Sequence, residues 1–331
     1  MTGGASTTLE RAAARLADLL TGTATTITEP RPHPGAALEL FDQVSLRPLA
    51  RTEAPVECWA VDGGQSVVAD ARCLQLLVTR AARVRYADGA CTLEDDGTLR
   101  ATLLGGEAER AAAVEALDVV GMDPTTSVDI NLVRDRWEWE AVERCVADAT
   151  PGALVLVDGD LQPDWRMPST FLAELLAEAA ARGVTLVGVT KHSSLASGGA
   201  PLLGRLEREA EASFGERSMW WAPVGRTRAD VGGVTIVAAR LDPDAPFSFR
   251  IDLPATAEPE AVLGPLAAVA DDAAFPGYPY PLSVADGLAA CPGWLRAEVR
   301  HELDSLFDLA GVPTDVRRRA FADRHDLMER S

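Results

Sequence analysis

The stretch ALVLVDGDL (153–161) is an apolar run of strand length that ends in acidic residues. FLAELLAEAAARG (171–183) follows it with the spacing of a helix and ends at Gly183, a residue type that commonly closes helices. TLVGVTK (185–191) is a second apolar run of strand length. Strand, helix and strand in this order indicate two parallel strands joined by a right-handed crossover.

Upstream of this unit, the sequence predicts antiparallel strands joined by tight turns. VECWAVDGG (56–64) is a short β-rich segment that we expect to end in an Asp-Gly-Gly turn. CLQLLVTRAARVRY (73–86) forms the next strand pattern and is broken at 87–89. Further helices are expected at 8–20, 106–118 and 132–148, with a connector from Thr21 to Gly35.

Downstream, the patterns alternate between helix and hairpin. We expect a helix at 202–215, a hairpin formed by 234–241 and 247–254, two helices around PGYPYP (276–281), and a helical tail from Trp294. The complete order is typical of an α/β fold with a mixed β-sheet flanked by helices, and RNase H-like topology has that order. The expected organisation is an N-terminal helical arm and connector (1–50), a nuclease-like domain (51–292) and a C-terminal helical tail (293–331).

The composition limits the class of protein. Hydrophobic residues make up 47% and charged residues 24% of the 331 residues, which is typical of a soluble globular protein and excludes overall disorder. No apolar run is long enough to cross a membrane, and the early acidic residue and the charged interruptions of the N-terminus do not fit a signal peptide. The five cysteines are scattered without a CxxC pair, which indicates a reduced, cytoplasmic setting.

The charge balance is strongly acidic. Thirty-one basic residues oppose fifty carboxylates, so the net charge is −19, and only one of the basic residues, Lys191, is a lysine. A protein that coats nucleic acid without sequence preference needs a basic face, so this class is disfavoured. An enzyme that binds nucleic acid in a narrow site is compatible with this charge, because net charge says little about local fields.

Three expected strands present a polar residue at or near their C-terminal ends: Asp62, Asp158 and Lys191. Ligands bind at this edge in open α/β sheets. Asp-Gly after a strand can also be a simple turn, but two such pairs and a lone lysine at corresponding strand ends favour a site. If the strand continues beyond Asp158, Asp160 shares its side, so only one of the two is expected to reach the site.

Two further carboxylates lie on predicted helices. Glu138 falls on the apolar stripe of helix 132–148, where an unpaired charge is costly unless it pairs or binds metal. The alternatives are exposure at the edge of the stripe or pairing with Arg134. Asp286 follows GYPYP and lies beside an inner face of Leu282, Ala285 and Ala289, or is simply exposed on its helix. Tyrosines in a Pro-rich turn such as Tyr278 and Tyr280 are most often packing residues.

Asp62, Glu138, Asp158 and Asp286 together offer hard oxygen ligands that suit Mn²⁺ or Mg²⁺. Two such ions stabilise the attacking and leaving oxygens of phosphodiester hydrolysis, and the compact charge of Lys191 suits a phosphate oxygen. A P-loop and the motifs HExxH, GxSxG and GxGxxG are absent, and no histidines pair at zinc spacing. A haloacid-dehalogenase-like phosphatase is a weaker alternative, since Asp-Gly-Asp lies deep in the chain rather than after the first strand.

The chain resembles the NurA nucleases over roughly 55–292. The resemblance rests on AVDGG (60–64), LVRDRWEWE (132–140), LVLVDGDL (154–161), LVGVTKHSS (186–194), FRIDLP (249–254) and GYPYPLSVADGLA (277–289), in that order. It implies an RNase H-like core, an acidic Mn²⁺ site, degradation of DNA ends, and a homodimer that docks on a hexameric HerA-type ATPase.

Residue by residue, the resemblance implies that Asp62, Asp158 and Glu138 bind metal, and that Lys191 and Tyr280 belong to the catalytic site. Asp286 stands where many NurA proteins carry a histidine; an aspartate can also ligate a hard cation. Asp-Gly-Gly replaces the commoner Asp-Gly-Ser of the first motif.

The resulting interpretation is a Mn²⁺- or Mg²⁺-dependent deoxyribonuclease. It would act as a 5′–3′ exonuclease and single-strand endonuclease on DNA ends with a HerA-type translocase, in repair or defence against phage. The alternative is a NurA-like dimer that has lost catalysis and serves as a clamp on an ATPase ring, which the charge of −19 favours.

Overall fold

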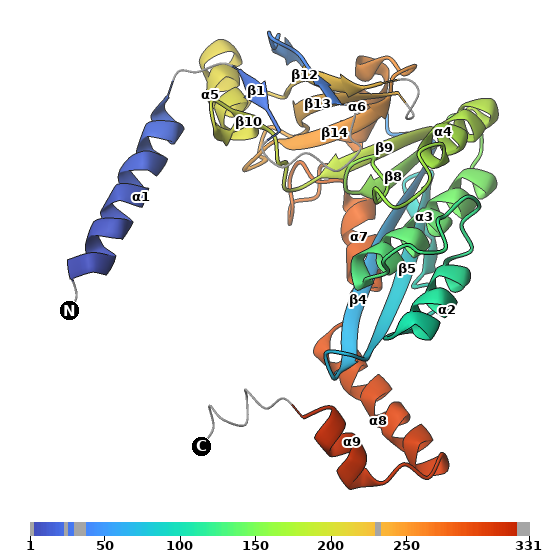
Figure 1. The fold of residues 1–331 in the computed structure, drawn as a ribbon. Helices are drawn as coiled ribbons and strands as arrows, with labels where there is room; N and C mark the ends of the chain where they lie inside the picture. Colours follow the sequence, from blue (N-terminus) through green and yellow to red (C-terminus); the bar gives the residue numbers. More distant parts are fainter. Residues whose placement is uncertain (1–2, 23–25, 30–37, 229–232, 323–331) are drawn as a thin grey trace.

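The computed structural model describes residues 3–22, 26–29, 38–228 and 233–322, and side chains from Thr8 onward. Most strands of these residues belong to one 11-stranded mixed sheet with the order β2-β12-β13-β14-β9-β8-β4-β5-β6, in which β3 also pairs with β12 and β7 with β5 (Figure 1). Most of the expected connector from Thr21 to Gly35 lies outside the described residues, as does the end of the tail from residue 323.

One half of the sheet has RNase H-like topology, as expected. The long strands β4 (Glu57–Asp70) and β5 (Gln75–Ala87) form an antiparallel pair, and β6 (Ala90–Asp95) and β7 (Arg100–Leu104) both pair with β5. The crossover unit adds β8 (Leu154–Asp158) parallel to β4 and β9 (Thr185–Thr190) parallel to β8, through α4 (Phe171–Arg182).

The other half of the sheet is antiparallel. It consists of β14 (Phe249–Pro254), β13 (Val234–Arg240) and β12 (Trp220–Thr227). β13 and β14 pair antiparallel, which confirms the hairpin expected at 234–241 and 247–254. β12 pairs with β13 on its other side. β12 was not predicted, and neither were β2 (Leu38–Leu40) and β3 (Arg47–Pro48), which pair with it from within the region 1–50 expected to form a helical arm and connector. A small second sheet contains β1 (Ile27–Thr28), β10 (Ala196–Ser197) and β11 (Ala200–Pro201).

Helices cover both faces of the sheet, and the alternation of side chains along β4 defines the two cores. Trp59 and Val61 point into a core with α3 (Ile130–Asp148), α4 and α5 (Leu202–Phe214). Cys58 and Ala60 point into a second core with α6 (Pro259–Ala268) and α7 (Tyr280–Ala289). α3 and α7 therefore lie on opposite sides of β4 and β5 (Figure 1).

Three terminal helices and one peripheral helix contribute no described residue to these two cores. α2 (Glu107–Leu117) lies beside β7, while α8 (Gly293–Leu309) and α9 (Thr314–Ala320) extend beyond the β4–β5 tip (Figure 1). α1 (Gly3–Thr21) runs away from the sheet, and its Leu9 and Leu16 are exposed. The helices expected at 8–20, 106–118, 132–148, 171–183 and 202–215 and in the tail are confirmed where the structure describes them. Among the described helices, none has the length and apolar character needed to cross a membrane.

The expected Asp-Gly-Gly turn at 62–64 is wrong, because β4 continues through it to Asp70. The two glycines allow helices to approach the sheet closely. A Cβ on Gly63 would lie 2.7 Å from a carboxylate oxygen of Glu138 on α3, and a Cβ on Gly64 would lie 1.7 Å from the carbonyl oxygen of Ala289 on α7. The turn instead connects β4 and β5 beyond Asp70, where Asp70 accepts a hydrogen bond from the backbone of Arg72.

Candidate active site

Three side chains of the candidate site come from adjacent strands and project from the same face of the sheet. Val61 of β4 pairs with Val157 of β8, so Asp62 lies beside Asp158, and Asp158 pairs with Val189 of β9, two residues before Lys191. The residues two positions earlier on each strand, namely Ala60, Leu156 and Val189, all belong to the core under α6 and α7. Because side chains alternate along a strand, Asp62, Asp158 and Lys191 are directed toward α7.

Helix α7 brings the fourth side chain, Asp286, over these strand ends. Leu282, Ala285 and Ala289 are buried against the sheet, as the sequence predicted, and Asp286 follows Ala285 at the edge of this inner face. Gly64 permits this arrangement, since only a glycine lets the backbone at Ala289 come so close to β4.

The three carboxylates of Asp62, Asp158 and Asp286 each offer an oxygen, and these oxygens lie within 4.8 Å of one another. The Lys191 ammonium donates to Asp158 Oδ2 at 2.7 Å and to Asp286 Oδ1 at 3.3 Å. Asp62 Oδ1 accepts a hydrogen bond from the Gly63 backbone at 2.7 Å. The structure thus brings together four of the six residues that the sequence proposed.

The electrostatics of this cluster reflect excess negative charge. Burial and the neighbouring carboxylate of Asp158 raise the pKa of Asp62 to about 7. Burial lowers the pKa of Lys191, but its hydrogen bond to Asp158 and the charges of Asp158 and Asp286 outweigh this and raise it overall. One ammonium therefore compensates only part of the charge of three converging carboxylates.

A hard divalent cation fits this donor set. The oxygens converge at a spacing that one ion can bridge, they come from three separate elements, and Asp62 is buried without a cationic partner of its own in the described chain. Mn²⁺ and Mg²⁺ prefer such carboxylate oxygens. Asp62, Asp158 and Asp286 are thus the side chains that could hold a metal.

Glu138 is not a member of this carboxylate group. It is buried on α3, on the opposite face of the sheet, behind Gly63. Burial raises its pKa well above the ordinary value; the charge of Asp62 adds to this rise, while that of Arg134 opposes it. The sequence placed Glu138 correctly on an apolar stripe but could not show which face of the sheet that stripe covers.

The tyrosine that lies at the site is Tyr278 rather than Tyr280. The Tyr280 ring contacts Tyr86 of β5 edge-on at a centroid distance of 4.9 Å, within the core under α7. The Tyr278 ring lies 5.0 Å from the Lys191 ammonium. Burial and the charges of Asp158 and Asp62 raise the pKa of the Tyr278 hydroxyl. The GYPYP motif identified the right segment, and only the turn geometry decides which tyrosine faces the carboxylates.

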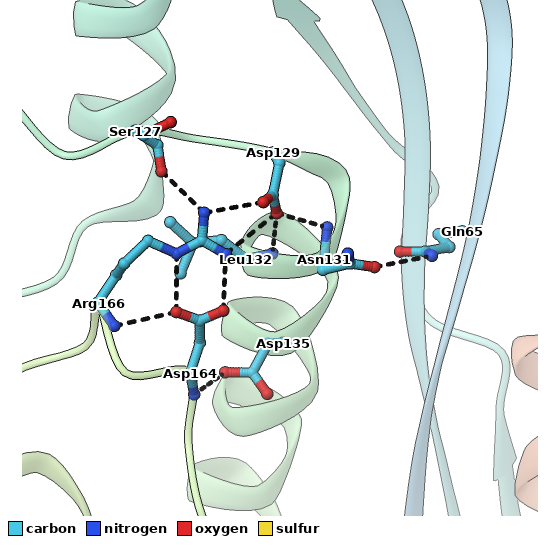
Figure 2. A network of polar contacts seen from close by, with 8 residues as sticks. All are labelled: Gln65, Ser127, Asp129, Asn131, Leu132, Asp135, Asp164 and Arg166. Atoms are coloured by element: carbon cyan, nitrogen blue, oxygen red, sulfur yellow. Dashed lines mark hydrogen bonds and ion pairs between the residues drawn. The ribbon is translucent and has the colours of Figure 1, made fainter. Parts of the chain in front are cut away.

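A separate polar network ties the loop after β8 to α3 (Figure 2). The buried Arg166 guanidinium forms ion pairs with Asp164 at 2.7 Å and with Asp129, the N-cap of α3, at 2.9 Å. Asp135 of α3 accepts a hydrogen bond from the Asp164 backbone at 2.9 Å. Asp160, the other acidic residue after β8, lies 3.5 Å from Arg250 on β14. As expected, only Asp158 of the two reaches the site.

No family model matches the chain, and no curated protein matches it. The NurA nuclease from Sulfolobus solfataricus superposes with a TM-score of 0.57 and 13% sequence identity, covering 93% of this chain and 95% of that chain. A NurA structure with manganese superposes with a TM-score of 0.50 and 10% identity, covering 92% and 98%. The chain therefore has the fold of the NurA nucleases.

Proposed function

We propose that this protein is a divalent-metal-dependent nuclease that hydrolyses phosphodiester bonds of DNA. The observation that carries the proposal is the cluster of Asp62, Asp158 and Asp286, whose carboxylate oxygens lie within 4.8 Å of one another and of which Lys191 pairs with Asp158 and Asp286. The NurA-like fold supports it, and one of the structures that share the fold is described as containing manganese.

Each residue of the cluster has a distinct task in this proposal. Asp62, Asp158 and Asp286 would hold one or two Mn²⁺ or Mg²⁺ ions. The bound metal would supply an activated water and would stabilise negative charge at the phosphate. Lys191 binds a phosphate oxygen of the DNA through its ammonium, a point charge that suits this role. The Tyr278 ring lies 5.0 Å from this ammonium and helps to position it.

We assign supporting tasks to the two residues that lie outside the cluster. Glu138 supports the site from the opposite face of the sheet, where its carboxylate lies against Gly63, the neighbour of Asp62 on β4. Tyr280 acts through packing, because its ring fixes the start of α7 against Tyr86 of β5. Neither is proposed to contact the reacting phosphate.

The wider function follows the sequence resemblance. The protein would act on DNA ends as a 5′–3′ exonuclease and single-strand endonuclease, as a cytoplasmic homodimer with a HerA-type hexameric ATPase, in repair or phage defence. The charge of −19 supports a partner that contributes to holding DNA, because phosphates repel an acidic surface.

The decisive experiment is a cleavage assay with end-labelled DNA across a metal series. We expect cleavage with Mn²⁺ or Mg²⁺ that EDTA abolishes. Asp62→Asn, which nearly preserves shape, should reduce cleavage to background, whereas Glu298→Gln on the exposed face of α8 should cleave like the wild type. Full activity of Asp62→Asn would refute the assignment.

The second candidate function is a catalytically inactive clamp on an ATPase ring. The net charge favours it, as does the position of Lys191, which already pairs with two of the three carboxylates. Stable co-elution with a HerA-type ATPase, together with no cleavage under any metal, would support the clamp over the nuclease.

A further inference from the structure

A cavity of about 380 Å³ opens directly beside the carboxylate cluster. Lys191, Asp286 and Tyr278 line it and also belong to the cluster or touch it. Its remaining wall is mostly apolar and includes Phe247, Phe249 and Phe275, with His192 and Ser283 as its polar members. The volume lies in the range of sites that bind small organic groups.

Three of the aromatic rings, Phe247, Phe249 and Tyr278, form a row that ends at the cluster. Phe247 contacts Phe249 at a centroid distance of 5.9 Å, and Phe249 contacts Tyr278 at 5.5 Å. Lys191 lies over the far end of this row, 5.0 Å from the Tyr278 ring. Whatever occupies the cavity is therefore adjacent to the ammonium that we assign to phosphate.

Two of these rings are unusually exposed for their type. Phe247 is 56% and Phe275 is 62% exposed, although Phe249 and Tyr278 beside them are buried. Exposed aromatic faces that line a cavity, rather than being scattered singly, are typical of binding sites. Neither ring contributes to a described core cluster, so packing of the fold does not account for them.

The backbone holds both rings in place. Phe275 lies in a turn in which Gly277 donates to the Ala270 carbonyl at 2.7 Å and Tyr278 donates to the Phe275 carbonyl at 3.1 Å. Gly277 has a φ of 87°, and a Cβ there would lie 2.5 Å from Ala245 Cβ, so the turn packs tightly on the β13–β14 loop. Phe247 precedes Ser248, whose backbone and hydroxyl both donate to Glu207.

We propose that this cavity binds an unpaired nucleobase of the DNA strand whose phosphate lies at the carboxylates, by stacking it on Phe247 and Phe275. The inference rests on the proposed nuclease function and specifies its substrate as single-stranded DNA or a frayed end. Aromatic rings stack every base, so this site selects unpaired bases without selecting sequence. Stacking also suits an acidic protein, because it does not depend on basic side chains.

The first test measures binding apart from cleavage. A single-stranded oligonucleotide with 2-aminopurine is titrated in Ca²⁺, and stacking is followed as fluorescence quenching. Phe247→Ala/Phe275→Ala should weaken binding about tenfold and abolish quenching, as expected for the loss of a stacked base. Phe275→Leu, which keeps an apolar side chain without a ring, should also lose quenching. Phe214→Ala, an exposed phenylalanine of α5 outside the cavity, is the matched control and should behave as wild type.

The second test uses cleavage of substrates that carry one abasic nucleotide at successive positions. At one position, the abasic nucleotide should slow cleavage by the wild type about tenfold. With the abasic nucleotide at that position, the double variant should cleave no more slowly than the wild type. The inference would be overturned if the double variant lost cleavage rate equally on intact and abasic DNA. It would also be overturned if the double variant still quenched 2-aminopurine fluorescence normally. Quenching by the wild type without cleavage in any metal would instead reject the nuclease and leave the base site standing.

Discussion

At the scale of single residues, Lys191 carries the most specific information. It is the one lysine among thirty-one basic residues, and it forms ion pairs with Asp158 and Asp286 at the end of a buried strand. A bias toward arginine explains the rest of the chain but not this exception. The site requires a compact charge that can sit between two carboxylates and above the Tyr278 ring.

We therefore predict that Lys191→Arg impairs cleavage by about tenfold or more even though it keeps the positive charge, because a planar fork replaces a point charge. Steady-state kinetics on DNA with Mn²⁺ would measure the effect. Arg182→Lys on the exposed part of α4 is the control and should leave the rate unchanged. A Lys191→Arg variant that cuts normally would show that its lysine is incidental.

The raised pKa of Asp62 predicts how stability depends on pH in EDTA. The folded pKa of about 7 exceeds the ordinary value of 3.8, so the folded state holds the proton more tightly. The free energy of unfolding should fall as pH rises from 4 to 7, by on the order of 2 kcal/mol from this group. Urea unfolding across this range would measure it.

Asp62→Asn should reduce the slope of this pH dependence because it removes one of the buried carboxyls whose pKa is raised, while Asp135 and Glu138 remain. Asp70→Asn on the same strand is the control. The hydrogen bond from Arg72 lowers the pKa of Asp70, so removing this carboxyl cannot reduce the decrease in the free energy of unfolding between pH 4 and 7. An unchanged slope in Asp62→Asn would contradict the prediction.

At the scale of elements, the glycines of β4 determine how α7 meets the sheet. A Cβ at Gly64 would lie 1.7 Å from the backbone carbonyl oxygen of Ala289, which no rotamer change can relieve. Because α7 carries Asp286, its distance from β4 decides whether the third carboxylate reaches the cluster.

Gly64→Ala is expected to destabilise the fold by about 2–3 kcal/mol and to reduce metal-dependent activity, since α7 must shift. Gly287→Ala on the same helix is the matched control, because a Cβ there contacts nothing within 4 Å. It should be neutral or stabilise by about 0.5–1 kcal/mol through helix propensity. Denaturant unfolding of both variants tests the contrast, and equal stabilities would contradict it.

The elements that the sequence missed have identifiable causes. β12 contains Pro223 and Gly225, residue types that argue against a central strand, and they flank an irregularity in its pairing with β13. β2 and β3 are too short to produce a period. β4 was cut short because Asp-Gly-Gly is a common turn sequence, whereas here the glycines serve helix packing.

At the scale of the whole molecule, the charge of −19 constrains how DNA is held. A protein that relies on many basic contacts shows a steep salt dependence, with a slope of about −0.9 for each neutralised phosphate of duplex DNA and about −0.7 for single strands. A site built on bound metal, one lysine and aromatic rings neutralises few phosphates.

We predict that log K for single-stranded DNA falls with log salt with a slope of about −2 for the isolated protein. Fluorescence anisotropy between low and physiological salt, in Ca²⁺, would measure the slope. Adding a HerA-type ATPase should make the slope steeper if the ATPase ring supplies basic side chains that contact the DNA phosphates. A slope steeper than about −5 for the isolated protein would reveal a basic DNA face that the net charge conceals.

The sequence by itself determined the α/β class, the crossover unit, most helices, and four residues of the cluster: Asp62, Asp158, Lys191 and Asp286. Local hydrophobic periodicity and strand-end polarity carry that information because they depend on neighbours along the chain. Only the tertiary structure decided that Glu138 lies behind the sheet, that Tyr278 rather than Tyr280 faces the carboxylates, and that exposed phenylalanines adjoin them. These outcomes depend on which face a helix covers and how a turn orients its rings, and both follow from packing between segments distant in sequence.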